Sequence, residues 1–467
     1  MSIINGYIVP HPPVTIPEIA KGRENEVSQT IDAYAKVGQM IAKDDPDTII
    51  IVTSHSIMYA DYFHISPGDK AHGDMARFDA PNLCFDVNYD KELAQYISSV
   101  CVTNDINAGG LGEKDPRLDH GTMIPLYHIK KQFKGADYKV VRISLANLSP
   151  LLHYKFGKCI AEACKNLKRK AVILASGDLS HCCKEDGPYG YRHEGPIFDD
   201  TVVDIMKTGN FIDLMTFSPT FVENSLQCGL NTFNVLAGAL DGRDVDINFL
   251  SYERTLGVGY AVCNFTPDLS HINPDRQFDV KLENRIKKDL KRRDEKENPY
   301  VKLARTTLEK YVTTKKYLSL TDINDIITED MLNDNSAVFV TIKKDGAVRG
   351  CIGTVTPTTG CLAHEIITNT INAGINDPRF TPITIDELPF LSYSVDVLYD
   401  PEPINSLDEL DVKKYGVIVN TEDKRGLLLP NLETVTTTEQ QLEIALKKAG
   451  ISKDEEYEMQ RFEVVRY

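Results

Sequence analysis

Short hydrophobic runs alternate with amphipathic stretches along the first half of the chain. Runs rich in Val and Ile predict buried strands at residues 3–9, 47–54, 138–146 and 170–176. The longer stretches 24–43 and 152–168 between them predict helices. Strands that alternate with helices in this way are typical of an α/β domain.

The end of this half departs from that alternation. The segment "VDINFLSYERTLGVGYAVCNF" (245–265) predicts two adjacent strands around a turn. Strands joined so closely pair antiparallel, whereas strands joined through helices pair parallel. We therefore expect an α/β N-terminal domain with a mixed central sheet flanked by helices.

The second half, after Pro299, shows a different pattern. It predicts a helix at 299–314, paired strands over 336–355 with a turn at Asp345-Gly346, a helix at 361–374 and further strands beyond. Helices and strands are segregated here instead of alternating. The second half therefore predicts an α+β C-terminal domain.

A charged segment separates the two halves. From residue 281, "KLENRIKKDLKRRDEKENP" holds eight Lys or Arg against five Asp or Glu. Leu282, Ile286 and Leu290 lie four residues apart, which favours an exposed amphipathic helix, although a plain solvated linker also fits. We expect a first domain at 1–275, a charged linker or linker helix at 276–297 and a second domain at 298–467.

Composition narrows the possible classes of protein. A chain of 467 residues is long enough for two hydrophobic cores, and its apolar runs fall far short of the roughly 20 residues of a membrane span. The start lacks the pattern of a secretory signal, so we expect a cytoplasmic protein that does not bind membranes. A net charge of −16 argues against nucleic acid as a partner. Ten cysteines without a repeating spacing fit reduced thiols or a metal ligand better than a disulfide framework.

Titratable residues follow the predicted strands of the first half. His11 follows the first strand in "VPHPPV", His55 follows the second in "TSHS", and Asp178 and His181 follow the fourth in "SGDLSHCC". His120 lies in "RLDHGTMIPL", a loop that enters a helix. Because the carboxyl ends of strands in an α/β sheet meet at one crevice, these side chains are expected to converge on a metal.

A structural role must be weighed against this interpretation. A single histidine after a strand is more often a hydrogen-bonded structural residue than a ligand, but several such histidines in one domain rarely coincide by accident. The remaining histidines show no comparable placement and are expected to be structural: His64, His72, His128, His153, His193 and His271.

Four motifs in order, "PHPP", "SH", "LDHGTMIPL" and "SGDLSH", resemble those of the class III extradiol dioxygenase superfamily, the LigB-like and Memo-like proteins, over about residues 3–265. The resemblance implies that His11 and His55 are metal ligands and that His181 is the active-site base. It also implies that His120 assists the substrate. Asp178 either orients His181 or is only a helix cap or turn residue.

The third ligand is where the sequence departs from the dioxygenases, which use a carboxylate. The segment "FVENSLQCGLNTFNVLAGALDG" (221–242) resembles the Memo-like region, which makes Cys228 the third ligand, with Glu223 as an alternative. The resemblance implies Fe(II), while two histidines and a thiolate also suit Zn or Cu. The expected function is a non-haem metal enzyme acting on a small catechol-like or other aromatic or enol substrate. The alternative is a Memo-like metal-binding or redox protein, or a scaffold, without dioxygenase turnover.

The second half resembles the AMMECR family over about 295–467, through "GAVRGCIGTVTP", "NDPRFTPITIDELPFLSYSVDVL", "GVIV" and "RGLLLP". That family is met beside Memo-like proteins and a radical-SAM protein, so the resemblance implies a radical-SAM partner but supplies no activity. Arg349 and Cys351 are two residues apart on a predicted strand and are expected to share a face, where a cation would favour the thiolate. A structural hairpin with a buried cysteine fits equally well. The oligomeric state is not predicted.

Overall fold

The computed structural model describes residues 2–133, 138–323, 325–344, 347–432 and 435–467. The chain divides into two compact units, an N-terminal unit (Met1–Arg285) and a C-terminal unit (Ile286–Tyr467). The division falls within helix α9 (Phe278–Lys296), which occupies most of the charged segment. Each unit is described by itself.

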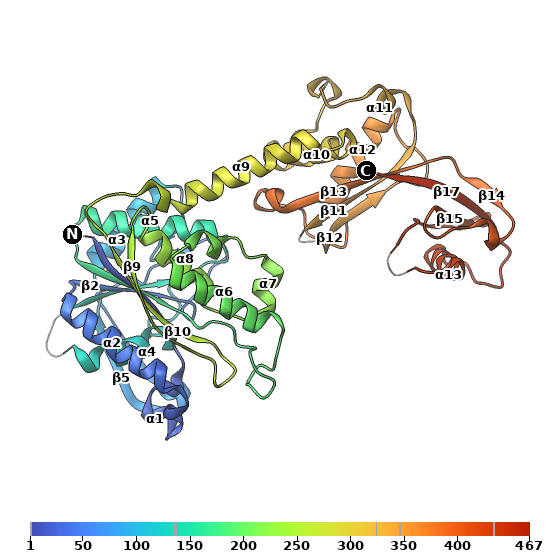
Figure 1. Cartoon of the computed structure of the whole chain (residues 1–467). Helices are drawn as coiled ribbons and strands as arrows, with labels where there is room; N and C mark the ends of the chain where they lie inside the picture. Colours follow the sequence, from blue (N-terminus) through green and yellow to red (C-terminus); the bar gives the residue numbers. More distant parts are fainter. Residues whose placement is uncertain (1, 134–137, 324, 345–346, 433–434) are drawn as a thin grey trace. The chain divides into compact units, whose positions relative to one another are not determined.

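The N-terminal unit is built on a mixed six-stranded sheet (Figure 1). Its strands are β1 (Ile3–Val9), β2 (Thr48–Thr53), β7 (Lys139–Ser144), β8 (Ala171–Ser176), β9 (Val245–Glu253) and β10 (Tyr260–Pro267). The order is β7-β2-β8-β1-β10-β9, with the first four parallel and β10 antiparallel to β1 and β9. The predicted mixed α/β sheet is confirmed.

Helices cover both faces of this sheet because its central strands are apolar on both sides. The helices of the unit are α1 (Pro17–Ala20), α2 (Ser28–Asp44), α3 (Lys91–Thr103), α4 (His120–Gln132), α5 (Pro150–Asn166), α6 (Glu194–Thr208), α7 (Pro219–Asn224) and α8 (Leu230–Ala239). Tyr7 packs in the cluster formed with α2 and α4, whereas its neighbour Gly6 faces α8. All six residues of β2 and of β8 are buried.

Two small strand pairs were not predicted from the sequence. Strand β3 (Phe63–His64) pairs with β6 (Ala108–Gly109), and β4 (Lys70–Met75) pairs with β5 (Ala80–Asn88) around the single turn η3 (Ala76–Phe78). Strands β3 and β6 have only two residues each, and β4 and β5 are rich in residue types that are depleted in strands (Lys, Ala, Gly, Asp, Asn and Pro), so the sequence carried little strand signal. The hairpin of β4 and β5 matters below because η3 lines the candidate site.

The C-terminal unit holds a curled antiparallel sheet with helices, as an α+β domain should (Figure 1). Its strands are β11 (Ala337–Lys344), β12 (Ala347–Gly353), β13 (Leu391–Leu398), β14 (Glu402–Ile404), β15 (Tyr415–Asn420), β16 (Arg425–Leu428) and β17 (Glu458–Arg466). Its helices are α10 (Pro299–Thr314), α11 (Glu329–Asn333), α12 (Leu362–Ile371) and α13 (Thr438–Ala449). The predicted turn at Asp345-Gly346 lies outside the described residues.

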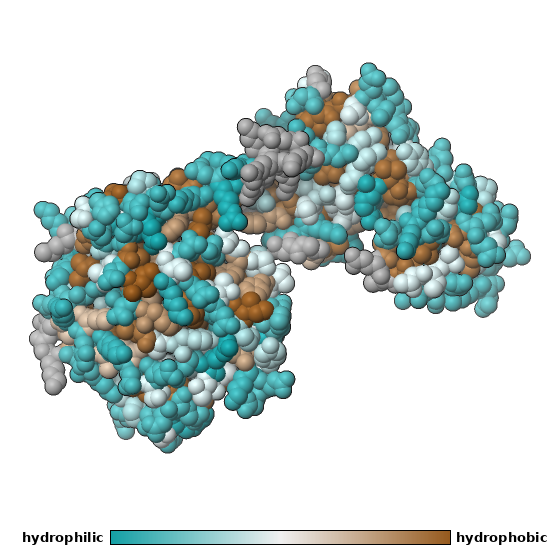
Figure 2. All heavy atoms as spheres, in the orientation of Figure 1, coloured by the Kyte–Doolittle hydropathy of each residue, from teal (hydrophilic) through white to brown (hydrophobic). Residues whose placement is uncertain are grey.

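Each unit has its own hydrophobic core. One core of the N-terminal unit lies under α2 and α4, and one core of the C-terminal unit lies between α10, α12 and the sheet. Hydrophilic side chains dominate the face shown in Figure 2, with smaller hydrophobic patches between them. Among the described residues, no helix has the length and apolar character needed to cross a membrane.

Candidate metal centre

The carboxyl ends of three neighbouring strands position the candidate ligands. In the order β2-β8-β1, Ser176 at the end of β8 pairs with Thr53 of β2 and with Val9 of β1, so the three strands end together. His11 and His55 each follow two residues after these ends. The backbone therefore delivers both side chains to one edge of the sheet, as the sequence predicts.

Two glycines bring the start of α8 against this edge. A Cβ atom on Gly177 would lie 2.2 Å from the Cα atom of Gly229, so only glycine permits this approach of two backbones. The contact places Cys228 beside Asp178, whose backbone N–H lies 3.3 Å from the Cys228 Sγ atom. Cys228, which is more than 200 positions along the chain from His11, thereby reaches the same edge of the sheet.

His11 lies at the centre of the cluster. Its Nε2 atom is 2.8 Å from His55 Nε2 and 3.5 Å from Cys228 Sγ. Two groups of potential ligand atoms, each within 4.8 Å, share it: His11 with His55 and His120, and His11 with Asp178 and Cys228. His55 and Cys228 thus fall into different groups around the common donor, His11.

The tautomer of His11 follows from its hydrogen bonds. The Ser176 hydroxyl donates to the Gly121 carbonyl at 2.6 Å, so it accepts from His11 Nδ1–H at 3.0 Å. This leaves the lone pair of His11 on Nε2, which faces His55 and Cys228. Buried and fixed in this way, His11 is prepared to donate to a metal.

His120 is the first residue of α4 and closes one side of the cluster. Asp119 caps this helix by accepting from the Thr122 N–H at 3.1 Å, and it also accepts from the Thr53 hydroxyl at 2.8 Å. The cap ties the start of α4 to the end of β2. As a result the rings of His120 and His55 lie 4.1 Å apart between centroids.

Asp178 lies between His11 and His181. Its Oδ2 atom is 4.0 Å from His11 Nε2 and 3.9 Å from His181 Nε2, while Oδ1 accepts from the His11 backbone N–H at 2.8 Å. The ring of His181 stacks on Tyr189 with a centroid distance of 5.2 Å. Asp178 therefore contacts the ligand region from its buried side, and His181 borders it from the more open side.

Burial determines the protonation of these groups. It lowers the pKa of His11, of His55 and of His181, and it lowers the pKa of His120 to about 3. Burial likewise raises the pKa of Cys228 to about 12 and raises the pKa of Asp178. The imidazoles are neutral near pH 7 and offer lone pairs, whereas the thiol needs a nearby cation before it releases its proton.

Each pair of donors that includes His11 has about the spacing of two ligands on one ion, whereas His55 and Cys228 share no group within 4.8 Å. Two imidazole nitrogens at about 2.1 Å from one ion lie about 3.0 Å apart at a right angle and about 3.4 Å apart at a tetrahedral angle, and a nitrogen and a thiolate sulfur lie about 3.1 and about 3.6 Å apart. The nitrogen–sulfur distance of 3.5 Å falls within this range, and the nitrogen–nitrogen distance of 2.8 Å lies just below it. The distance between the imidazole nitrogens is also that of a hydrogen bond, which would hold the rings together without an ion.

The other residues considered from the sequence lie elsewhere. Glu223 is exposed on α7 and belongs to neither ligand group. Cys182 is buried with its sulfur 3.3 Å from the Ser225 carbonyl, and the Cys183 sulfur lies 3.3 Å from an Asp199 carboxylate oxygen. Neither of these two cysteines belongs to the groups around His11.

A cavity of about 310 Å³ opens beside the cluster. His55 and His120 form the wall nearest the cluster, and the remaining lining includes Ile57, Asp74, Arg77, Phe78, Lys114, Asp115, Arg117, Leu118, Asp119 and Met123. Its size lies at the lower end of pockets that bind small molecules. Sequence reasoning missed Arg77 and Phe78, because nothing in "DMARFDA" marks them as functional.

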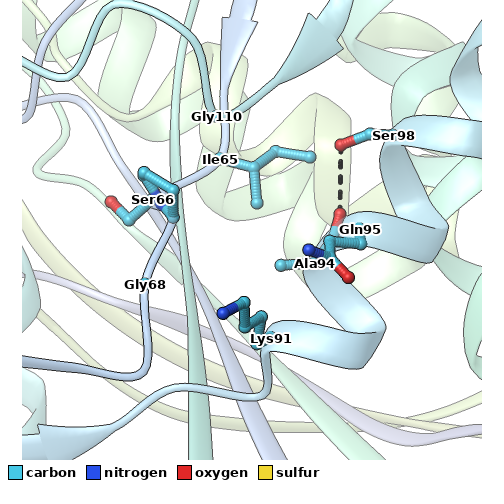
Figure 3. A pocket seen from close by; sticks show the side chains of 9 residues that line it. Ile65, Ser66, Gly68, Lys91, Ala94, Gln95, Ser98 and Gly110 are labelled. Carbon is cyan, nitrogen blue, oxygen red and sulfur yellow. Dashed lines mark hydrogen bonds between the residues drawn. The ribbon is translucent and has the colours of Figure 1, made fainter.

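A separate, smaller hollow of about 90 Å³ lies between the loop after β3 and helix α3 (Figure 3). The Ser98 hydroxyl beside it donates to the Ala94 carbonyl at 3.1 Å. Lys91 is the charged residue in its lining, and no candidate metal ligand reaches it. We assign no chemistry to this hollow.

In the C-terminal unit, Arg349 and Cys351 have different partners. Arg349 donates to both carboxylate oxygens of Glu387 at 3.0 Å, whereas the Cys351 thiol lies 3.2 Å from the Thr341 hydroxyl. The pairing of β11 with β12 is irregular at Arg349, where the register shifts. Side chains two residues apart share a face of the sheet only where the strand is regular, so the shift breaks the alternation that the predicted shared face of Arg349 and Cys351 required. The two side chains therefore have different hydrogen-bond partners.

Comparison with known proteins gives two matches along the chain. Residues 5–263 match the family model described as the catalytic LigB subunit of aromatic ring-opening dioxygenase, and residues 301–467 match AMMECR1. A protein of Clostridium acetobutylicum is 42% identical over 481 residues, covering 100% of this chain and 99% of its own length. A protein of Thermotoga maritima is 47% identical over 173 residues, covering 37% of this chain and 98% of its own length.

The N-terminal unit also has a named relative. The 2-aminophenol 1,6-dioxygenase beta subunit of a Pseudomonas species is 25% identical over 290 residues, covering 56% of this chain and 92% of its own length. The LigB match covers most of the mixed sheet and includes the converging histidines, and the AMMECR1 match spans the antiparallel sheet. The chain therefore belongs to the LigB family of aromatic ring-opening dioxygenase subunits, with an AMMECR1 region fused at its C-terminal side.

Proposed function

We propose that the N-terminal unit is a non-haem Fe(II) centre that opens small catechol-like aromatic rings in the extradiol manner. The observation that carries the proposal is the convergence of His11, His55 and Cys228 at one sheet edge, beside a cavity of about 310 Å³. Membership of the LigB family supports it.

In this proposal His11, His55 and Cys228 hold the metal. His11 is the indispensable donor because both ligand groups contain it, and Ser176 keeps its Nε2 atom free. A bound Fe(II) would acidify the hydroxyls of a catechol and pass electrons from the catechol to oxygen, since the ring and not the metal is oxidised overall. His120, grouped with His11 and His55, is close enough to substitute as a ligand if Cys228 does not bind.

The neighbouring residues position the substrate and move protons. His181 is neutral near pH 7 because burial lowers its pKa, so it can accept a proton from a substrate hydroxyl and later return it. Asp178, with Oδ2 3.9 Å from His181 Nε2, orients this ring. The ring of Phe78 lies 5.5 Å from that of His120 and offers an apolar wall to an aromatic substrate.

Anaerobic loading followed by oxygen tests this function. The full chain is loaded with Fe(II), mixed with catechols and exposed to oxygen, while oxygen uptake and the absorbance of ring-opened products are followed. Uptake matched by product supports the proposal, and Cys84→Ala, which changes an exposed cysteine outside the cluster, serves as the control. A metal-loaded protein that consumes no oxygen with any catechol contradicts it.

A second function is favoured by Cys228. A thiolate is softer than the carboxylate of the dioxygenases and is more easily oxidised, which suits metal handling or redox chemistry without turnover. The loading experiment separates the two functions. Metal retained at one ion per chain without oxygen uptake would favour the metal-handling role.

A further inference from the structure

Asp199 is a buried carboxylate on α6 that accepts hydrogen bonds from two other segments of the N-terminal unit. Its Oδ1 atom accepts from the Ser180 backbone N–H at 2.7 Å. Its Oδ2 atom accepts from the Tyr252 hydroxyl at 2.8 Å and from the Cys183 thiol at 3.3 Å. The residue is fully buried, with 0% of its surface exposed. The carboxylate therefore joins α6 to strand β9 and to the segment that carries His181.

This last segment, "DLSHCC" (178–183), is called the base turn below. Its backbone pairs with the residues before β10, where the Leu179 N–H donates to the Gly259 carbonyl at 2.9 Å. Asp199 binds the residue just before His181 and the residue two positions after it. The base turn is thus held by backbone bonds on one side and by one carboxylate on the other.

Gly259 allows the carboxylate to lie against this backbone. A Cβ atom on Gly259 would lie 2.0 Å from Asp199 Oδ2 and 2.9 Å from Leu179 Cβ, so a larger residue would displace both. The Gly259 N–H also donates to the Ser180 carbonyl at 2.8 Å. A shift of the carboxylate would consequently be passed to the residue beside His181.

Asp199 is the group of this network that titrates near neutral pH. Burial raises its pKa to about 6, although its three hydrogen bonds and the charge of Arg254 lower it. Burial also raises the pKa of Tyr252, and it raises the pKa of Cys183 to about 12, so both groups stay neutral. Arg254, which donates to the Tyr252 hydroxyl at 3.2 Å and pairs with Asp200, stays charged. Protonation of Asp199 is therefore the event that changes this network between about pH 5 and 7.

The ionised form of Asp199 has a cost for folding. Its folded pKa exceeds the value of about 3.9 in an unfolded chain, so its contribution to stability is lost as the pH rises through 6. A neutral amide of the same shape would avoid this cost. What the ionised form provides is a stronger acceptor, since a charged carboxylate binds an N–H roughly twice as strongly as a neutral oxygen does.

We propose that Asp199 is a positioning residue for His181, because its ionised carboxylate holds the base turn in the conformation that aims the imidazole at the substrate. The inference rests on the proposed function, in which His181 is the base, and adds a residue that acts only through it. Protonation of Asp199 weakens the bond from the Ser180 N–H and releases the base turn. A displaced base loses its reach to the substrate proton, so turnover falls.

Hydrogen exchange tests the contact without relying on turnover. Mass spectrometry on the full chain, loaded anaerobically with Fe(II), follows the backbone amides of the base turn. Asp199→Asn is expected to speed exchange at Ser180 by about fivefold or more. In the wild-type protein the same amide is expected to lose protection as the pH falls from about 7 to about 5, after correction for the intrinsic rate. This second measurement needs no variant to fold.

Steady-state rates test the role in turnover. Asp199→Asn is expected to lower kcat for catechol ring opening about tenfold or more, with KM and metal content within about twofold, because a base acts in the chemical step. Tyr252→Phe keeps the bond from Ser180 and is expected to have a smaller effect. Asp241→Asn is the matched control, because this carboxylate also accepts from a tyrosine, Tyr154, at 2.6 Å. It should change neither kcat nor exchange in the base turn.

The outcomes separate this inference from the proposed function. Faster exchange at Ser180 together with a lower kcat in Asp199→Asn supports the positioning role. Unchanged exchange, or faster exchange with an unchanged kcat, overturns that role alone. Faster exchange in a protein that opens no catechol supports the hold of Asp199 on the base turn and contradicts the dioxygenase. Equal protection of the wild-type Ser180 amide at both pH values overturns the dependence on the ionised carboxylate.

Discussion

His181 lies close to the candidate ligands, and we assign it as a base and not as a ligand. Its Nε2 atom lies 3.9 Å from Asp178 Oδ2, and it belongs to neither ligand group around His11. Removing it should leave the donors intact while removing the proton acceptor. We expect His181→Ala to keep its metal and to lose turnover by at least about 100-fold.

Metal analysis and steady-state rates on the same samples check this prediction. Tyr189→Phe is the matched control, because it keeps the aromatic ring that stacks on His181 and should retain both metal and most activity. Loss of metal in His181→Ala would place the residue among the ligands and contradict the assignment.

At the scale of single residues, the sequence indicated part of this site. His11 and His55 could be recognised because each follows an apolar run that reads as a strand. Cys228 precedes a helix, and only the family resemblance marked it. Phe78 could not be found, since the three-residue turn η3 is too short to carry a periodic signal.

Among the elements, the contact between the end of β8 and the start of α8 is the tightest part of the site. A Cβ atom on Gly177 would meet Gly229 Cα at 2.2 Å, and backbone atoms cannot rotate away as a side chain can. We expect Gly177→Ala to destabilise the fold by about 1–3 kcal/mol and to lower metal content by moving Cys228.

Thermal unfolding by far-UV circular dichroism and metal analysis measure these two effects. Gly360→Ala is the control, because no heavy atom lies within 4 Å of its added Cβ and its φ angle lies outside the left-handed range of +20° to +160°. A Gly177→Ala protein with unchanged stability and full metal would show that this close approach does not position Cys228.

The 3-10 segment before β13 (Ile385–Phe390) is held by an ion pair of Glu387 with Arg349 and Lys344, which predicts a pH dependence. Burial alone would raise the pKa of Glu387, but hydrogen bonds from Arg349, the Thr384 N–H and Lys344 outweigh it and lower the pKa to about 2. Because the pKa is depressed by folding, the pair stabilises the protein above pH about 4.5. The stabilisation is lost as the pH falls toward 2.

Glu387→Gln should therefore cost at most about 3 kcal/mol at pH 7 and much less near pH 2. The chain has no tryptophan, so denaturant unfolding is followed by circular dichroism. Glu455→Gln, which breaks an exposed pair with Lys424, should change little at any pH. An equal loss for Glu387→Gln at both pH values would contradict the account.

Elements differed in how well the sequence predicted them. The apolar runs of β1, β2, β7 and β8 gave strands close to those observed, because strands buried on both faces are almost wholly apolar. The hairpin of β4 and β5 escaped notice because Lys, Ala, Gly and Asp, which make up most of "KAHGDM", are poor strand formers, although polar and apolar residues alternate there. Convergence of the site depends on contacts between distant segments, which local patterns do not encode.

For the whole molecule, we propose that the two units fold independently. Each has its own core, and the division lies within α9, whose first half binds the N-terminal unit through Lys158–Asp279 at 2.6 Å and Lys155–Glu283 at 2.8 Å. Limited proteolysis is expected to cut between about residues 286 and 297 and to release two stable fragments. If cleavage in this segment unfolded both units in one cooperative step, the result would contradict this proposal.

The central claim concerns the ligands of the metal. Full-length protein is purified without oxygen, and the metal bound per chain is measured for Cys228→Ala beside Glu223→Ala. Because Cys228 Sγ lies 3.5 Å from His11 Nε2 and Glu223 is exposed outside the cluster, we expect Cys228→Ala to lose at least about tenfold in metal affinity. Glu223→Ala should keep the wild-type content. Full metal in Cys228→Ala together with loss in Glu223→Ala would replace the thiolate by a carboxylate and contradict the account.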